Sequence, residues 1–130
     1  MAIRAYWDNP EQTTLVIEIN DPWVWTEMYE AVDEGVKMID SVNHTVDVIT
    51  DWRNHKHFPP DMFTHARNLT RKRHERAGVN ALVGMHPTFM PMWHVFSRAY
   101  SAVVKQHPFW FIDTMEEARE KLAQARQNRA

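Results

Sequence analysis

The chain has no cysteine, only three glycines and no long apolar run. The lack of cysteine excludes disulfides, thiol catalysis and cysteine-ligated zinc or iron–sulfur sites. The three glycines are too scattered to form a glycine-rich phosphate-binding loop. No apolar stretch approaches the roughly 20 residues that a membrane-spanning helix needs. The N-terminus also lacks a signal-peptide core. The sequence therefore predicts a cytoplasmic protein without a transmembrane segment, and no cofactor is expected.

Length and composition are typical of one soluble globular domain spanning residues 1–130. Hydrophobic residues make up 44% of the chain and charged residues 25%, which is ordinary for a protein with a packed core. The net charge is −2, so the molecule as a whole has no basic character that would favour a nucleic acid as its partner.

Strand-like and helix-like segments alternate along the chain. Helices that regularly follow strands predict a largely parallel sheet, and two adjacent strands at the start add an antiparallel hairpin. The predicted fold is a single-domain α/β sandwich with a mixed five-stranded sheet and four helices. Strands are expected at residues 3–7, 13–20, 45–52, 79–84 and 108–112, and helices from Thr26, over 61–76, from Thr88, and from Asp113 or Thr114.

Several local signals place the ends of these elements. Thr26 is a suitable N-cap for the first helix, because its hydroxyl can accept a bond from a free amide of the first turn. Gly78 is the expected C-cap of the second helix, and the tail after Ala125 is expected to fray. Segment 45–52 is expected to be the central strand, and Pro108 indicates an edge strand.

The order of elements resembles the STAS fold of sulfate transporters and anti-sigma-factor antagonists, and more closely its SpoIIAA-like branch. The features that carry the resemblance are the opening hairpin, the Trp-Val-Trp-Thr entry into the first helix at 23–26, and the segment Val-Asp-Val-Ile-Thr-Asp at 46–51, which a loop and a helix follow. The resemblance covers the architecture of the whole chain. It implies a small non-catalytic domain that binds a protein or a ligand.

The chain departs from this family at the regulatory position. The antagonists carry a phosphorylatable Ser or Thr after the central strand, at the start of the next helix, whereas Asp51 here is followed by Trp, Arg and Asn. The next hydroxyl belongs to Thr64, which is expected inside the helix. Switching by phosphorylation is therefore not expected.

Candidate binding residues gather where the predicted strands end, which is the edge at which open α/β sheets bind ligands. Paired His55 and His57, with Asp51 and His86, could ligate a divalent metal. A solvated polar loop is the favoured explanation, because nothing in the sequence fixes a tetrahedral geometry, and no metal is predicted. The candidate partner-binding or ligand-binding residues are Trp25, Asp51, Trp52, Arg53, His55, His57, Met85, His86 and Met90.

Two further patterns have a plain structural explanation. The basic residues Arg67, Arg71, Lys72, Arg73 and Arg76 could contact phosphates or an acidic partner. A solvated helix face is favoured for them, because no aromatic residues alternate with them.

Asp51 could be a phospho-accepting aspartate, but no lysine follows the last strand, so it is expected to pair with Arg53 or to cap the next segment.

The leading functional hypothesis is a non-enzymatic regulatory domain that contacts a protein partner or a second copy of the chain. The alternative is a domain that binds an apolar small molecule or a metal at the strand ends. A pocket lined by Trp25, Trp52, Phe58 and Met85 would favour a ligand. Methionine-rich apolar surface left exposed near Met90 would favour a partner.

Overall fold

The computed structural model describes residues 2–56, 59–99, 101–106 and 108–129. It contains the predicted five-stranded mixed sheet, with strands in sequence order from one edge to the other. The first two strands are antiparallel and the remaining pairs are parallel. β3 is central and β5 is an edge, as predicted. The strands are β1 (Ile3–Trp7), β2 (Thr14–Asn20), β3 (Val46–Asn54), β4 (Ala77–Val83) and β5 (Phe109–Ile112).

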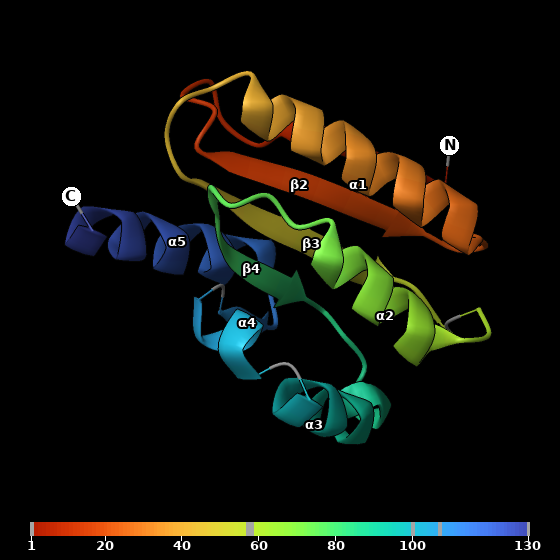
Figure 1. Ribbon diagram of the computed structural model, residues 1–130. Coiled ribbons are helices and arrows are strands. Elements are labelled where there is room, and N and C mark those ends of the chain that lie inside the picture. The colour runs from red at the N-terminus through yellow and green to blue at the C-terminus, as the bar shows by residue number, and fades with distance from the viewer. Residues whose placement is uncertain (1, 57–58, 100, 107, 130) are drawn as a thin grey trace.

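Helices cover both faces of this sheet (Figure 1). α1 (Trp25–Asp40) and α2 (Met62–Arg71) lie over one face, and α5 (Met115–Arg129) packs on the other. α3 (Met90–Ala99) lies on the α1 and α2 side, where Trp93 contacts the ring of Phe111 at the edge strand with centroids 5.2 Å apart. Within the described part of the chain, no helix has the length and apolar character needed to span a bilayer.

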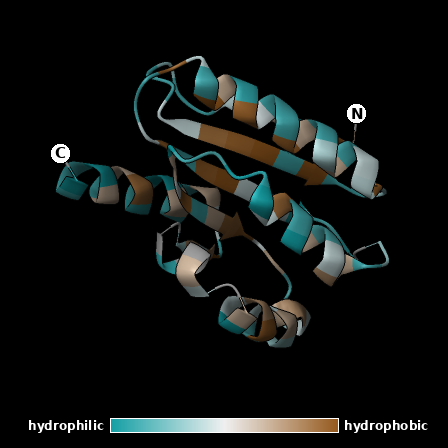
Figure 2. Cartoon of the chain, viewed as in Figure 1, coloured by the Kyte–Doolittle hydropathy of each residue, from teal (hydrophilic) through white to brown (hydrophobic). Residues whose placement is uncertain are grey.

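β3 is buried on both faces from Val46 to Trp52. Side chains of a strand alternate between the two faces, so Val48 packs with the α1 core and Ile49 packs with the α5 core. A strand covered on both sides reads as a nearly continuous apolar run. The sheet accordingly carries the most hydrophobic segments, whereas the outer faces of the helices are largely polar (Figure 2).

The first helix begins differently from the prediction. Val24, not Thr26, is the N-cap, and the helix starts at Trp25. The Glu27 carboxylate accepts a hydrogen bond from the Val24 amide at 3.2 Å. Glu27 therefore satisfies a free amide at the helix start, and the hydroxyl of Thr26 is not needed as a cap.

The second helix is shorter than predicted, and the C-cap prediction for Gly78 is wrong. α2 ends at Arg71, and Gly78 lies inside β4. The guanidinium of Arg76 donates to the carbonyls of Ile39 and Val42 at the end of α1, which fixes the chain there as it enters the sheet. Glycine is required at position 78 because a Cβ would lie 2.3 Å from Oδ1 of Asp47.

The segment predicted as a third helix consists of three pieces. A 3₁₀ turn, η1 (Pro87–Phe89), leads into α3, and α4 (Ser101–Gln106) follows, with Tyr100 outside the described residues. The predicted cap at Thr88 is wrong, because the ring Nδ1 of His86 caps η1 by accepting from the Thr88 amide at 3.2 Å.

The last helix is capped at its start and tied to the sheet at its end. Thr114 caps it as predicted, accepting from the Glu117 amide at 3.1 Å. The predicted fraying after Ala125 is wrong, because the helix continues to Arg129, which donates to Asp47 at 2.6 Å. Arg126 donates to the carbonyls of Thr13 and Thr45. These bonds anchor the helix C-terminus beside the N-terminal ends of β2 and β3.

We expect the substitution Asp47→Ala to lower the free energy of unfolding by about 3 kcal/mol, because the buried Val79 amide and Arg129 both lose their acceptor. Chemical denaturation followed by tryptophan fluorescence measures this loss. The control is Asp33→Ala, whose carboxylate is 54% exposed in its pair with Lys72 and should contribute far less. Equal effects of the two substitutions would contradict the anchoring role of Asp47.

Candidate functional site: an apolar pocket under the second helix

An apolar pocket of about 240 Å³ lies between the sheet and the helices α1, α2 and α3. Its floor is formed by side chains of β2, β3 and β4, and the three helices form its walls. It extends along the strands from Ala77, at the start of β4, to Trp52 near the end of β3 and Met85 just beyond the end of β4. The pocket is thus elongated and mostly hydrophobic.

The pocket exists because α2 covers the sheet without filling the space beneath it. Among the residues described, α2 has no fully buried side chain. Small side chains line this space, including Ala66 on α2 and Ala77 on β4. A close-packed interior leaves few voids larger than a water molecule, so a space of this size is a distinct feature of the fold.

Three of the predicted binding residues line this pocket: Trp25, Trp52 and Met85. They come from α1, β3 and the loop after β4, and the fold brings them together at the C-terminal ends of the strands. Phe58, the fourth residue of the predicted pocket, lies outside the described residues, as does His57. Met90 is half-buried at the start of α3 and is not among the described lining residues.

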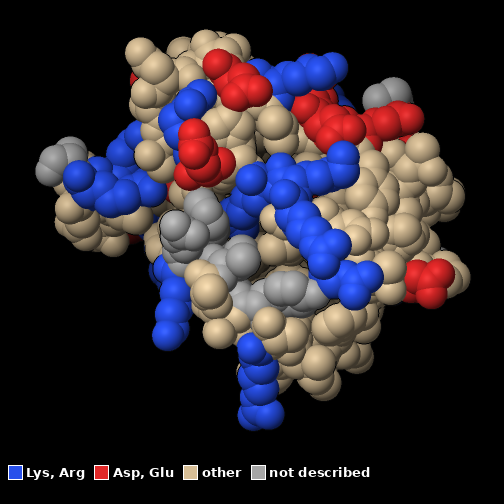
Figure 3. Space-filling model, in the orientation of Figure 1, with Lys and Arg blue, Asp and Glu red and all other residues tan. Residues whose placement is uncertain are grey.

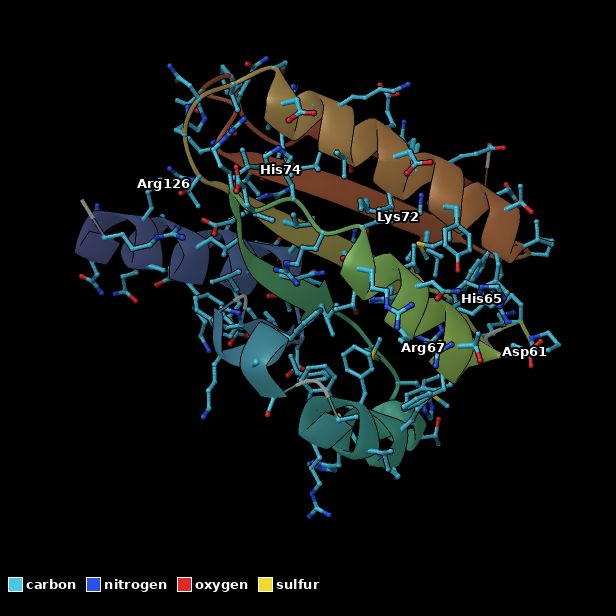
Figure 4. The ribbon with its side chains drawn as sticks, in the orientation of Figure 1. Asp61, His65, Arg67, Lys72, His74 and Arg126 are labelled. Atoms are coloured by element: carbon cyan, nitrogen blue, oxygen red, sulfur yellow. The ribbon has the colours of Figure 1, made fainter. Side chains whose placement is uncertain are left out.

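Trp25 closes one end of the pocket. Its indole Nε1 donates to the Pro60 carbonyl at 2.6 Å, and its ring stacks on His65 of α2 with centroids 4.6 Å apart. The His65 ring in turn bonds the Tyr29 hydroxyl at 2.8 Å. Figure 4 shows His65 and Asp61 near the start of α2, at the end of the helix that faces the N-terminus of α1. This aromatic contact joins α1 to α2.

Asp51 and Arg53 lie away from the pocket and pair with each other, as the sequence predicted. Arg53 donates to the Asp51 carboxylate from Nε at 2.9 Å, from Nη2 at 2.8 Å and from its own amide at 3.1 Å. Burial acts to raise the pKa of Asp51, but these bonds from Arg53 outweigh it, and the pKa lies below the ordinary value of 3.8. The pair stabilises the end of β3.

The histidines do not converge on a shared site within the described part of the chain. His55 is buried against the rings of Trp52 and Phe89, whereas His86 is exposed and caps η1. Among the residues that the structure describes, no group of three or more His, Asp or Glu could hold a metal ion.

Sequence reasoning missed most of the pocket walls on α3. Met92, Trp93 and Phe96 line the pocket, and none of them is among the predicted binding residues. The spacing of three and four residues gives the inward face, but nothing in that pattern distinguishes a packed core from a wall with space behind it.

The pocket contains a few polar groups. The hydroxyl of Thr50 donates to Oδ1 of Asn80 at 2.8 Å on the sheet side. Arg73 also lines the pocket, so its prediction as part of a solvated helix face is wrong. It lies beyond the end of α2, in the turn before β4, and its guanidinium carbon lies 5.0 Å from the centre of the Phe109 ring. Burial lowers the pKa of Arg73 to about 10.

No protein-family model, curated protein or solved structure matches the chain. The STAS resemblance therefore stays a prediction from the order of elements, and the function has to be argued from the geometry of the pocket.

We expect Asp51→Asn to be less stable than the natural protein at pH 7 and the difference to shrink as the pH falls below about 4. Because the folded-state pKa of Asp51 is depressed, its ionised form stabilises the fold above the unfolded pKa. That contribution is lost as the pH falls through the folded pKa. Urea denaturation across this pH range measures it, with Glu117→Gln, an exposed helix pair with Lys121, as the control. A difference in stability between Asp51→Asn and the natural protein that does not change with pH would contradict the depressed pKa of Asp51.

Proposed function

We propose that the protein binds an apolar small molecule in the pocket between the sheet and α2. The observation that carries this proposal is the pocket itself, an elongated apolar space lined by Trp25, Trp52 and Met85. Ligand sites are typically concave, mostly apolar and furnished with a few polar groups. Here those polar groups are supplied by Thr50, Asn80 and Arg73.

The dimensions of the pocket suit a molecule of moderate size. An apolar cavity of about 150 Å³ in another protein stays dry and holds a benzene ring. The space under α2 is larger, at about 240 Å³, so it has room for more than a single ring. Its elongated shape along β3 and β4 fits an extended chain better than a disc.

The cover of the pocket offers a route of entry. Because α2 buries no side chain fully among its described residues, fewer packing contacts hold this helix in place than hold a helix with a buried face. The helix is held at its N-terminal end by the stacked pair Trp25 and His65. We infer that movement of α2 about this contact admits the ligand.

The groups that line the pocket favour ligand binding over catalysis. Among the described lining residues, His74 is the sole imidazole, and no carboxylate is present to act with it as an acid–base pair. His74 is already bonded through Nε2 to Asp40 at 2.6 Å. The non-enzymatic role predicted from the sequence is therefore part of this proposal.

We expect 1-octanol to quench or shift the tryptophan fluorescence, since Trp25, Trp52 and Trp93 line the pocket. Ala66→Phe should weaken this binding about tenfold or more, because the new ring occupies the space beneath α2. Thr64→Phe is the matched control, because position 64 is exposed on the same helix and does not line the pocket. Fluorescence titration gives both affinities. Saturable binding that Ala66→Phe leaves unchanged would place the ligand elsewhere.

A protein-interaction domain is the second candidate function, and the outer face of α3 favours it. Val95 is 59% exposed on this helix, although Trp93 and Phe96 of the same helix face the pocket. An exposed apolar side chain on a helix that also forms a pocket wall would let a partner respond to the ligand. In this second proposal the partner is another copy of the chain.

If α3 mediates self-association, Val95→Asp should shift the protein toward the monomer, because a charge would be buried at the contact. Val24→Asp is the matched control, since Val24 is similarly exposed, at 56%, but lies at the start of α1. Sedimentation velocity over a concentration series measures the shift. A natural protein that remains monomeric throughout would rule out self-association through this face.

A further inference from the structure

Arg73 places a cation in the wall of a mostly apolar pocket. Its Nη2 donates to the Gly78 carbonyl at 2.8 Å, and its guanidinium lies over the Phe109 ring. Its Nε is buried and has no hydrogen-bond partner among the described residues. Neither does Arg73 form an ion pair with any residue that the structure describes.

Such an arrangement is unfavourable without a counter-charge. Taking a charged group out of water costs free energy that a neutral carbonyl and an aromatic ring repay only in part. Two arginines that contact the sheet have acidic partners: Arg53 pairs with Asp51, and Arg129 pairs with Asp47. Arg76 also has a buried Nε without a bond, but it lies outside the described lining of the pocket. Within the described lining of the pocket, no Asp or Glu is available to Arg73. The counter-charge can come from the ligand.

We propose that the ligand is an amphiphile with an apolar tail and a single carboxylate, and that Arg73 receives this carboxylate at the end of the pocket near Ala77. This inference rests on the proposed function and names the chemical class of the molecule bound. The planar guanidinium offers N–H donors in a fork that fits a carboxylate. One buried cation neutralises one charge, which favours a monoanion over a phosphate monoester.

The shape of the pocket sets the direction in which the tail lies. Arg73 and Ala77 lie near the N-terminal end of β4, whereas Trp52 and Met85 lie toward the opposite ends of the strands. When the carboxylate is bound at Arg73, the tail therefore runs along β3 and β4 toward Trp52 and Met85. Thr50 and Asn80 lie between these two ends, where they could accept a hydroxyl group on the tail.

The charge on the surface above the pocket favours an anion as well. Figure 3 shows a row of Lys and Arg side chains across the middle of this face, and Figure 4 places Arg67 and Lys72 on it along α2. Clustered positive charge raises the local concentration of an approaching anion and its rate of association. The row therefore attracts the same class of molecule that the buried arginine would hold.

The natural protein alone provides a first test with three probes of equal chain length. We expect octanoate to bind more tightly than uncharged 1-octanol, and octylammonium to bind more weakly than either, because only the anion offsets the charge of Arg73. Isothermal titration calorimetry at low and moderate salt gives the three affinities. Octylammonium binding as tightly as octanoate would overturn the proposal, whatever the variants do.

Substitution of Arg73 then tests whether this side chain causes the preference for octanoate. We expect Arg73→Met to weaken octanoate binding about 10-fold to 100-fold, the range for loss of a charge-assisted hydrogen bond, and to leave 1-octanol binding almost unchanged. Arg71→Met is the matched control, because Arg71 is exposed at the end of α2 and does not line the pocket. At moderate salt, which screens exposed charges, it should change the two affinities equally.

The outcomes separate this inference from the function on which it rests. If none of the three probes binds, binding of an apolar molecule in the pocket is itself wrong. If octanoate and 1-octanol bind equally, and Arg73→Met changes neither, the pocket binds an apolar molecule but the carboxylate assignment is wrong. If Arg73→Met does not fold, Arg73→Lys keeps the charge without the fork, and it should retain a weakened preference for octanoate over 1-octanol.

Discussion

The structure depends on one constraint, which is that β3 is buried on both faces while carrying two aspartates. Asp47 and Asp51 share the α5 face with Ile49, because all three occupy alternate positions of the strand. Each carboxylate is satisfied by an arginine: Arg129 from α5 holds Asp47, and Arg53 from β3 itself holds Asp51. The α5 face is thereby fixed by directional, charged contacts as well as by apolar packing.

The opposite face of the same strand is organised differently. Val48, Thr50 and Trp52 point toward α1 and α2, but α2 stays far enough from them to leave a pocket. Filling that space with larger side chains would add stability, since burial of each extra methylene contributes about 0.8 kcal/mol. The chain instead keeps the small side chain of Ala66 there. A fold held firmly on the α5 side can accommodate an unfilled space on the other.

The sequence predicted the sheet well because its strands alternate with helices in a simple order and β3 contains a run of β-branched residues. It predicted the pair of Asp51 and Arg53 for a similar reason, since two residues at i and i+2 of a strand share a face. It did not predict where α2 ends. That boundary depends on Arg76 reaching the carbonyls of Ile39 and Val42, contacts distant in sequence that no local propensity encodes.

The position of this boundary determines the environment of Arg73. In a helix extending to Arg76, Arg73 would belong to a solvated basic face, which is the simplest reading of five basic residues within one segment. Because α2 ends at Arg71, the chain turns, and Arg73 lies instead against Phe109 and the pocket. Its depressed pKa follows from burial, whereas the carboxylates of β3 are all paired. Sequence patterns locate charges along a helix, but the tertiary fold decides which of those charges lacks a partner.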